Sequence, residues 1–234
     1  MDLKVKIFAD GAILEDMLSL YANPMIKGFT TNPTLMRKGG VSDYEAFAKE
    51  VAAAIPDRPI SLEVFADDFD SMFDQAMMIS GWGDNLNVKI PITNTKGESA
   101  IPLIERLVGE GVKLNITAMM TAAQIESCVK VLGGSPPCYL SLFAGRVADS
   151  GRDPIPVMEE ALRFMSPQPQ LELIWASPRE VYNIIQANDI GCHIITVSYG
   201  LLKKIPLFGK DLDEYSLETV QMFYDDAQSA GFKL

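Results

Sequence analysis

Residues 85–92, Asn-Leu-Asn-Val-Lys-Ile-Pro-Ile, place a lysine inside an apolar run that is typical of a β-strand. The aliphatic residues alternate with Asn87 and Lys89, so the two sets face opposite sides of such a strand. Lysine is rarely buried, and burying it without a partner is costly. Burial favours the neutral amine, which can attack a carbonyl carbon. The alternative for this segment alone is a strand-end lysine whose stem reaches to solvent.

Short apolar runs of this kind alternate with helix-like stretches along the chain. Strands are predicted near residues 4–9, 26–30, 60–65, 86–91, 112–117, 138–143, 171–176 and 192–197. Helices are predicted near residues 12–22, 42–54, 69–80, 97–109, 121–132, 153–165, 178–188 and 198–205. The units average about 29 residues, which matches a βαβ repeat. The pattern predicts an α/β fold, a single (β/α)8 TIM barrel domain over residues 1–234 with an extra C-terminal helix near 216–230. An open, doubly wound sheet is the alternative.

Two of the predicted helices carry recognisable start signals. Ser42 and Glu45 have the spacing of a capping box, and Pro178 suits the first turn of a helix. We therefore expect helices to begin at these two places.

The formal net charge of −11 bears on the partners of the chain. Nucleic acids and anionic membranes need a basic surface, so neither is expected as a partner. A phosphorylated small molecule responds to local charge, and a site for it would need a few positioned arginines.

The cysteines and the chain start indicate a cytoplasmic protein. Cys128, Cys138 and Cys192 are widely spaced and odd in number, which favours reduced thiols in the core over a disulfide framework. His193 is the single histidine, so no zinc site is expected. The first residues read as a strand and lack the apolar region of a secretion signal, and no apolar run is long enough for a transmembrane helix.

Polar residues share one face on several of the predicted strands. They are Ser61, Glu63, Asn87, Lys89, Asn115, Thr117 and Ser141, with Asp10 at the end of the first strand. Helices cover the outside of a barrel, so these side chains must line its mouth.

Each polar position also has a plain structural interpretation. Asp10 could cap the first helix, residues 30–33 could form an Asn-Pro turn, and Glu63 could pair with Lys89 as a buried ion pair. The polar set could also close a satisfied hydrogen-bond network. Such a network does not explain why one base and two acids collect at the same end.

Seven short motifs follow one another along nearly the whole chain. They are Ala9-Asp10, Thr30-Thr31-Asn32-Pro33-Thr34, Ser61-Leu62-Glu63-Val64, Val88-Lys89-Ile90-Pro91, Asn115-Ile116-Thr117, Ser141-Leu142-Phe143-Ala144-Gly145-Arg146 and Ala176-Ser177-Pro178-Arg179. In this order and spacing they resemble the transaldolases, class I Schiff-base aldolases built on a (β/α)8 barrel. The chain length resembles the compact branch that includes the fructose-6-phosphate aldolases.

The resemblance implies a role for each matching residue. Lys89 resembles the Schiff-base lysine, and Asp10 resembles the acid/base that handles the hydroxyl proton during carbon–carbon cleavage and formation. Glu63 and Thr117 resemble the pair that holds the catalytic water. The implied substrate-binding set consists of Thr31, Asn32, Asn115, Ser141, Phe143, Arg146, Ser177 and Arg179.

Within that set, Arg146, Ser177 and Arg179 resemble the phosphate-binding residues. Guanidinium groups suit phosphate, and a helix beginning at Pro178 would direct its N-terminus at an anion. The alternative for both arginines is an ordinary surface salt bridge.

The resemblance implies a transaldolase that moves a dihydroxyacetone unit from a ketose phosphate, such as fructose 6-phosphate or sedoheptulose 7-phosphate, to an aldose. Transaldolases carry Glu and Phe at the positions of Glu63 and Phe143, whereas fructose-6-phosphate aldolases carry Gln and Tyr. The implied chemistry needs no cofactor and no metal, because the iminium is the electron sink. Two alternatives stay open, an aldolase-type lyase that releases free dihydroxyacetone and a non-catalytic sugar-phosphate-binding barrel.

The resemblance also bears on partners and setting. It implies sugar phosphates as small-molecule partners, further copies of the chain in a homo-oligomer, and carbohydrate metabolism such as the pentose phosphate pathway. The predicted C-terminal helix carries the apolar residues Leu217, Val220, Met222, Phe223 and Ala227, a spacing that suits docking on its own barrel or on a neighbouring subunit.

Overall fold

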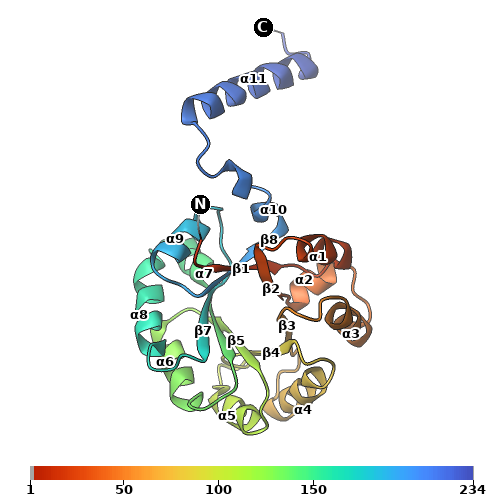
Figure 1. Ribbon diagram of the computed structural model, residues 1–234, viewed down its shortest axis with the longest axis vertical. Helices are drawn as coiled ribbons and strands as arrows, with labels where there is room; N and C mark the ends of the chain where they lie inside the picture. Colours follow the sequence, from red (N-terminus) through yellow and green to blue (C-terminus); the bar gives the residue numbers. More distant parts are fainter. Residues whose placement is uncertain (1–2, 234) are drawn as a thin grey trace. The chain divides into compact units, whose positions relative to one another are not determined.

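Eight parallel strands close into a barrel in which each strand pairs with the next and β8 pairs with β1 (Figure 1). The computed structural model describes residues 3–233. The strands are β1 (Lys6–Asp10), β2 (Ile26–Thr30), β3 (Ile60–Glu63), β4 (Leu86–Pro91), β5 (Leu114–Met119), β6 (Cys138–Leu142), β7 (Leu171–Trp175) and β8 (Ile194–Ser198). The predicted (β/α)8 barrel is therefore confirmed, and the open-sheet alternative is wrong.

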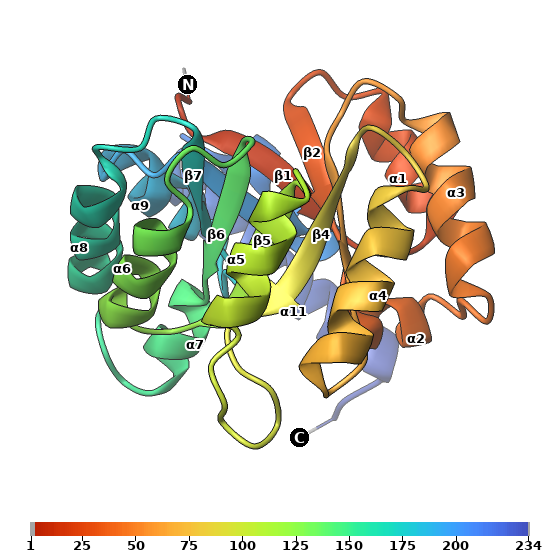
Figure 2. The same ribbon diagram turned by 90° about the horizontal axis from the view of Figure 1, so that it is seen from below.

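Helices surround the barrel, as the side view in Figure 2 shows. They are α1 (Leu14–Tyr21), α2 (Pro33–Lys38), α3 (Tyr44–Ala54), α4 (Phe69–Ser80), α5 (Ile101–Gly109), α6 (Ala122–Val131), α7 (Ala144–Asp149), α8 (Ile155–Met165), α9 (Asn183–Asp189) and α10 (Tyr199–Leu202). The longer helices around the barrel each bury one apolar stripe, as α5 does with Leu103, Ile104 and Leu107. This packing leaves the polar side of each strand to the barrel interior.

Both predicted helix starts are wrong in detail. Helix α3 is capped by Asp43, whose carboxylate accepts a hydrogen bond from the amide of Ala46 at 2.9 Å, and not by Ser42. Helix α9 begins at Asn183, and Pro178 lies in the preceding loop. The Asn183 side chain accepts hydrogen bonds from the amides of Arg179 and Glu180, which holds that loop in a non-helical form.

The ring of Phe8 fills the apolar part of the barrel interior. The ring packs with Ile174 and Ile194, and it meets Tyr139 edge to face with ring centroids 5.6 Å apart. A Cβ atom on Gly28 would lie 2.6 Å from the Phe8 ring, so only glycine fits at that position of β2.

The chain divides into two compact units, one ending at Leu202 and one beginning at Lys203. The second unit, taken by itself, contains a short 3₁₀ helix (η1, Ile205–Leu207) and the long helix α11 (Leu212–Ala230). Asp211 caps α11 by accepting from two amides of its first turn, and Gly231 ends it with φ +65°. The predicted C-terminal helix is confirmed and begins earlier than expected, because Asp211 is its cap. The single-domain assignment of residues 1–234 stays a prediction.

In α11 the apolar residues Leu217, Val220, Met222 and Phe223 are all more than a third exposed. Within residues 3–233, no helix is both long and apolar enough to cross a membrane.

Candidate active site

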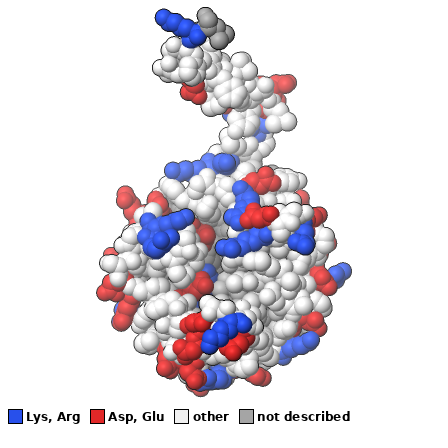
Figure 3. Space-filling view, turned by 180° about the vertical axis from the view of Figure 1, so that it is seen from behind, with Lys and Arg blue, Asp and Glu red and all other residues white. Residues whose placement is uncertain are grey.

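A cavity of about 110 Å³ opens among the carboxyl ends of the barrel strands. Its lining consists of Asp10, Thr30, Asn32, Lys89, Thr117, Ser141, Phe143, Arg146, Ala176, Ser177 and Thr196. Figure 3 shows a hollow in the middle of the barrel unit, with acidic and basic atoms in its depth. Eight of these residues were singled out from the sequence, so the fold does bring most of the predicted set together.

Lys89 is buried at the centre of this group, with only 6% of its surface exposed. Its Nζ donates a hydrogen bond to the carbonyl of Thr31 at 2.7 Å and lies 3.0 Å from Oε2 of Glu63. The alternative of a lysine reaching to solvent is therefore wrong. The proposed ion pair with Glu63 exists, and it lies directly beside the cavity.

Glu63 does not line the cavity, and its backbone is held by a residue that the sequence did not reveal. The amides of Phe29 and Thr31 donate to the carbonyls of Pro59 and Ser61. The next amide in this series would belong to residue 33 and would donate to the Glu63 carbonyl, but residue 33 is a proline and has no N–H. The hydroxyl of Tyr44 donates to the Glu63 carbonyl instead, at 2.7 Å. The Tyr44 ring packs against Phe65 and Trp82, with centroids 5.4 and 6.2 Å away. The one signal in the sequence was the missing amide of Pro33.

Asp10 lies at the end of β1 and accepts a hydrogen bond from the hydroxyl of Thr30 at 2.7 Å. It does not cap α1, because the residue before that helix is Ile13 and no side chain caps it. Burial raises the pKa of the Asp10 carboxyl, and this effect exceeds the lowering caused by the Lys89 ammonium and by the Thr30 hydroxyl. A partly buried acid with a raised pKa is suited to taking and returning a proton.

Thr30 and Thr196 also line the cavity and were not predicted as site residues. Their hydroxyls are hydrogen-bonded to each other, which links the end of β2 to β8 beneath Asp10. Thr196 could have been found by extending the alternation of inward-facing residues to the last strand.

A hydrogen-bonded chain crosses the interior below the cavity. The Asn115 amide donates to Ser61 Oγ at 3.0 Å, and Ser141 Oγ donates to Asn115 Oδ1 at 2.7 Å. The network interpretation is thus correct for these three residues. It does not extend to Thr117, whose buried hydroxyl has no hydrogen-bond partner among the described residues and faces the cavity. An unpartnered buried hydroxyl of this kind is expected to bind water or substrate.

Residues 31 and 32 hold the adjoining loop. The Asn32 side chain caps α2 by accepting from the amide of Leu35 at 2.9 Å, so the turn interpretation is correct for the backbone. Asn32 also lines the cavity. The Thr31 hydroxyl donates to the Ser61 carbonyl, which leaves the Thr31 carbonyl as the acceptor for Lys89.

The two arginines of the predicted phosphate set are placed differently. Arg146 lines the cavity together with Ser177, and its guanidinium lies 5.6 Å from the centre of the Phe143 ring. Arg179 does not line the cavity. Its guanidinium makes two hydrogen bonds to Asp149, one of them from Nε at 3.0 Å, so the surface salt-bridge interpretation describes this residue.

The backbone is strained at two points of the cavity rim. Ala118 and Ser177 have φ values of +62° and +61°. Ala118 lies within β5, where the pairing with β6 is irregular, and Ser177 follows the end of β7. Such a conformation costs about 1–3 kcal/mol in a residue other than glycine and is enriched at functional sites. Gly145, at the start of α7, approaches the Ser177 loop so closely that a Cβ would lie 1.5 Å from the Ser177 carbonyl oxygen.

Metal and thiol chemistry find no support in the described part of the chain. No group of three or more His, Cys, Asp or Glu side chains within residues 3–233 is placed to hold a metal ion. All three cysteines are buried, as predicted, and burial raises the pKa of the Cys128 and Cys192 thiols to about 12.

Comparison with known proteins gives three results. Residues 7–234 match the family model described as Transaldolase/Fructose-6-phosphate aldolase. A probable transaldolase of Thermoanaerobacter sp. (strain X514) is 32% identical over 231 residues, covering 98% of this chain and all of that protein. A probable transaldolase of Methanococcus maripaludis (strain C7) is 33% identical over 215 residues, covering 92% of this chain and 94% of that protein.

Among solved structures, the crystal structure of dihydrodipicolinate synthase from Rhodopseudomonas palustris superposes with a TM-score of 0.55. The match covers 95% of this chain and 79% of that one at 14% identity, so this likeness concerns the barrel fold alone.

Proposed function

Because the chain belongs to the transaldolase/fructose-6-phosphate aldolase family, whose members are enzymes of the aldolase type, we propose that it is a transaldolase. It would transfer a dihydroxyacetone unit from a ketose phosphate to an aldose through a Schiff base on Lys89. The observation that carries this proposal is a buried lysine, 3.0 Å from the Glu63 carboxylate, in a cavity that it shares with Asp10.

The first step is formation of the Schiff base. Glu63 accepts a proton from the Lys89 ammonium, and the neutral amine attacks C2 of the ketose to give a carbinolamine. Glu63 returns that proton to the carbinolamine hydroxyl, which leaves as water. The Thr117 hydroxyl and the Glu63 carboxylate are suited to bind this water. The resulting iminium cation is stabilised by the same carboxylate.

The second step is cleavage of the C3–C4 bond. Asp10 takes the proton of the C4 hydroxyl, C4 becomes the carbonyl carbon of the departing aldose, and the bonding electron pair moves through C3 and C2 to the iminium nitrogen. The enamine then attacks the carbonyl carbon of an acceptor aldose, Asp10 returns its proton to the new hydroxyl, and hydrolysis releases the new ketose. The raised pKa of Asp10 supports both directions of transfer.

Substrate positioning is assigned to the remaining polar lining. We assign binding of the hydroxyls of the dihydroxyacetone fragment to Asn32 and Ser141, which line the cavity, and orientation of Ser141 to Asn115, which accepts its hydrogen bond. Arg146 and Ser177 bind the phosphate of the substrate. Arg179 contributes only if it leaves Asp149, so we assign it a secondary role.

Phe143 supports transfer over simple cleavage. Its half-buried ring lines the cavity and carries no proton donor, so it keeps the enamine away from water until an acceptor arrives. A tyrosine in this place would bring a hydroxyl next to the enamine.

Product analysis with fructose 6-phosphate tests this proposal. The wild type should release little free dihydroxyacetone alone and should form sedoheptulose 7-phosphate when erythrose 4-phosphate is added. Phe143→Tyr is the matched variant, and it should release more free dihydroxyacetone. Equal release by the wild type with and without an acceptor would favour the aldolase-type lyase.

We also propose that the enzyme is a homo-oligomer of the carbohydrate metabolism of the cytoplasm, where its unpaired thiols stay reduced. The support is α11, whose apolar side chains Val220, Phe223 and Tyr224 are 61–64% exposed and follow one another at helical spacing. Light scattering should give a multiple of 25.7 kDa for the wild type and a smaller species for Phe223→Glu. A monomeric wild type would contradict this part of the proposal.

A further inference from the structure

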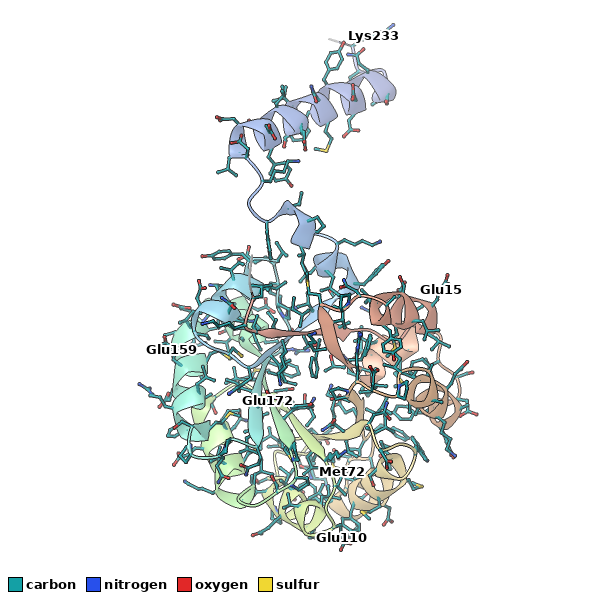
Figure 4. All side chains as sticks on the ribbon, in the orientation of Figure 1. Glu15, Met72, Glu110, Glu159, Glu172 and Lys233 are labelled. Atoms are coloured by element: carbon teal, nitrogen blue, oxygen red, sulfur yellow. The ribbon has the colours of Figure 1, made fainter. Side chains whose placement is uncertain are left out.

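A second cavity, of about 340 Å³, lies at the opposite end of the barrel. Its lining consists of Pro56, Asp57, Arg58, Pro59, Asp84, Asn85, Asn87, Lys113, Pro137 and Tyr139. These residues precede or begin strands β3 to β6, so the cavity opens at the amino ends of the strands, away from Lys89. Figure 4 looks along the barrel onto its interior side chains, among them the labelled Glu172 near the start of β7.

Asn87 points into this cavity without a partner. It shares the inward face of β4 with Lys89 and is only 4% exposed. Within residues 3–233, its carboxamide has no hydrogen bond to any other group. The carboxamide therefore presents its N–H donors and its carbonyl acceptor to whatever enters the cavity.

Tyr139 adds a second open hydrogen-bonding group to the same cavity. Its ring is fixed edge to face against Phe8, and its hydroxyl has no hydrogen-bond partner in the described part of the chain. Burial raises the pKa of Tyr139 to about 12, so the hydroxyl stays protonated and can donate.

The rim combines both signs of charge. Arg58 donates to the main-chain carbonyl of Asn23 at 3.3 Å, and Lys113 donates to that of Asp84 at 2.7 Å, so both keep further N–H donors for the cavity. The carboxylates of Asp57 and Asp84 also line it and balance the two cations. The lining therefore offers donors and acceptors side by side, with no net formal charge.

We propose that this cavity is a second binding site, for a neutral polyhydroxylated molecule of the size of a monosaccharide. Each hydroxyl of such a ligand both donates and accepts, which suits a carboxamide, a phenol, carboxylates and cations together. An anion would meet two carboxylates, and a cation would meet Arg58 and Lys113. The volume falls in the range of about 300–1,000 Å³ that is usual for small-molecule sites, and three prolines give it stiff walls.

The site is separate from the proposed active site. The hydrogen-bonded layer of Ser61, Asn115 and Ser141 crosses the interior between the two cavities. Binding there needs neither Lys89 nor a carbonyl group on the ligand, so the proposal does not depend on the Schiff-base chemistry.

The test is titration of the isotope-labelled protein with methyl α-D-glucopyranoside, sorbitol and myo-inositol, none of which can form a Schiff base. At least one should cause saturable shifts of the backbone amides of residues 57, 58, 84–87, 113, 138 and 139. Tyr139→Phe should weaken binding about five- to tenfold for one lost hydrogen bond, and Asn87→Leu should weaken it at least as much. Ser141→Ala, a matched change at the other end of the barrel, should leave the affinity unchanged.

Three outcomes would overturn the proposal: no shifts with any of the polyols, shifts confined to the Lys89 cavity, or shifts at the amino-terminal cavity with orthophosphate or glycine only. Thermal unfolding of each variant shows whether it is folded. If Asn87→Leu is not folded, the affinity of Tyr139→Phe tests the proposed site, because this variant keeps the ring contact with Phe8.

Discussion

The hydroxyl of Tyr44 is expected to hold the catalytic end of β3 in place. Tyr44→Phe removes only the hydrogen bond to the Glu63 carbonyl, 2.7 Å long, and keeps the ring contacts with Phe65 and Trp82. No neighbouring amide can replace the hydroxyl, because Pro33 has no N–H. The variant therefore leaves a carbonyl unsatisfied directly behind the residue that pairs with the Schiff-base lysine.

The expected cost follows from this geometry. A lost neutral hydrogen bond costs about 0.5–1.5 kcal/mol, and a buried acceptor left without a partner costs up to about 3 kcal/mol. We expect the free energy of unfolding to fall by about 1–3 kcal/mol. For a chain of this length, each kcal/mol lowers Tm by about 2–4 °C. Because the Glu63 carboxylate moves with its backbone, kcat should fall while KM changes little.

Denaturant unfolding and steady-state kinetics measure the two effects. Tyr21→Phe is the matched control, since the Tyr21 hydroxyl also donates a hydrogen bond of 2.7 Å, in an exposed pair with Asp57. Asp57 does not line the cavity that holds Lys89. Loss of the Tyr21 hydroxyl should change stability less and should leave kcat unchanged. If Tyr44→Phe behaves like Tyr21→Phe in both assays, the proposed support of Glu63 is wrong.

Two further predictions concern charge at the site. Burial raises the pKa of Asp10, so the native state holds the carboxyl proton more tightly than the unfolded state does. The native state therefore loses stability as the pH rises through the raised pKa. Asp10→Asn should be inactive yet more stable than the wild type at neutral pH. In calorimetry this advantage should vanish below about pH 4, where both states of the wild type are protonated, and a variant less stable than the wild type at pH 7 would contradict the argument. Arg146→Ala should raise KM for fructose 6-phosphate about 10- to 100-fold by removing a charged contact with phosphate, whereas Arg179→Ala should have a smaller effect because Asp149 already holds that guanidinium. Equal losses in the two variants, measured by steady-state kinetics, would show that Arg179 leaves its partner to bind substrate.

The barrel and the inner polar set were predictable because strand alternation decides which face a residue occupies. Helices cover the barrel from outside, so a polar residue at the inward position, such as Glu63, Asn115 or Thr117, has only the interior left to it. The same rule placed Asn87 inside. The prediction that the whole polar set lines the mouth is wrong for Asn87, because this residue lies at the start of β4 and lines the cavity at the amino ends of the strands.

The features that sequence reasoning missed depend on contacts between distant segments. Tyr44 reaches Glu63 only after α3 packs beside β3, and the Asn183 side chain delays the start of α9 by binding two amides of the loop before it. Arg179 matched a phosphate-binding pattern, but α7 places Asp149 within its reach. Local spacing carries no information about such partners.

The Schiff base on Lys89 is the central claim, and borohydride trapping tests it most directly. The protein is incubated with fructose 6-phosphate, reduced with borohydride, and examined by intact mass and peptide mapping. Lys89→Met tests the site, and Lys6→Met is the matched control, because Lys6 also pairs with a glutamate, Glu172, at 2.7 Å. We predict a reduced dihydroxyacetone adduct on the peptide that holds Lys89, present in the wild type and in Lys6→Met and absent in Lys89→Met. Binding of sugar phosphates with no adduct from any of a panel of ketoses would contradict the account and favour a non-catalytic sugar-phosphate-binding barrel.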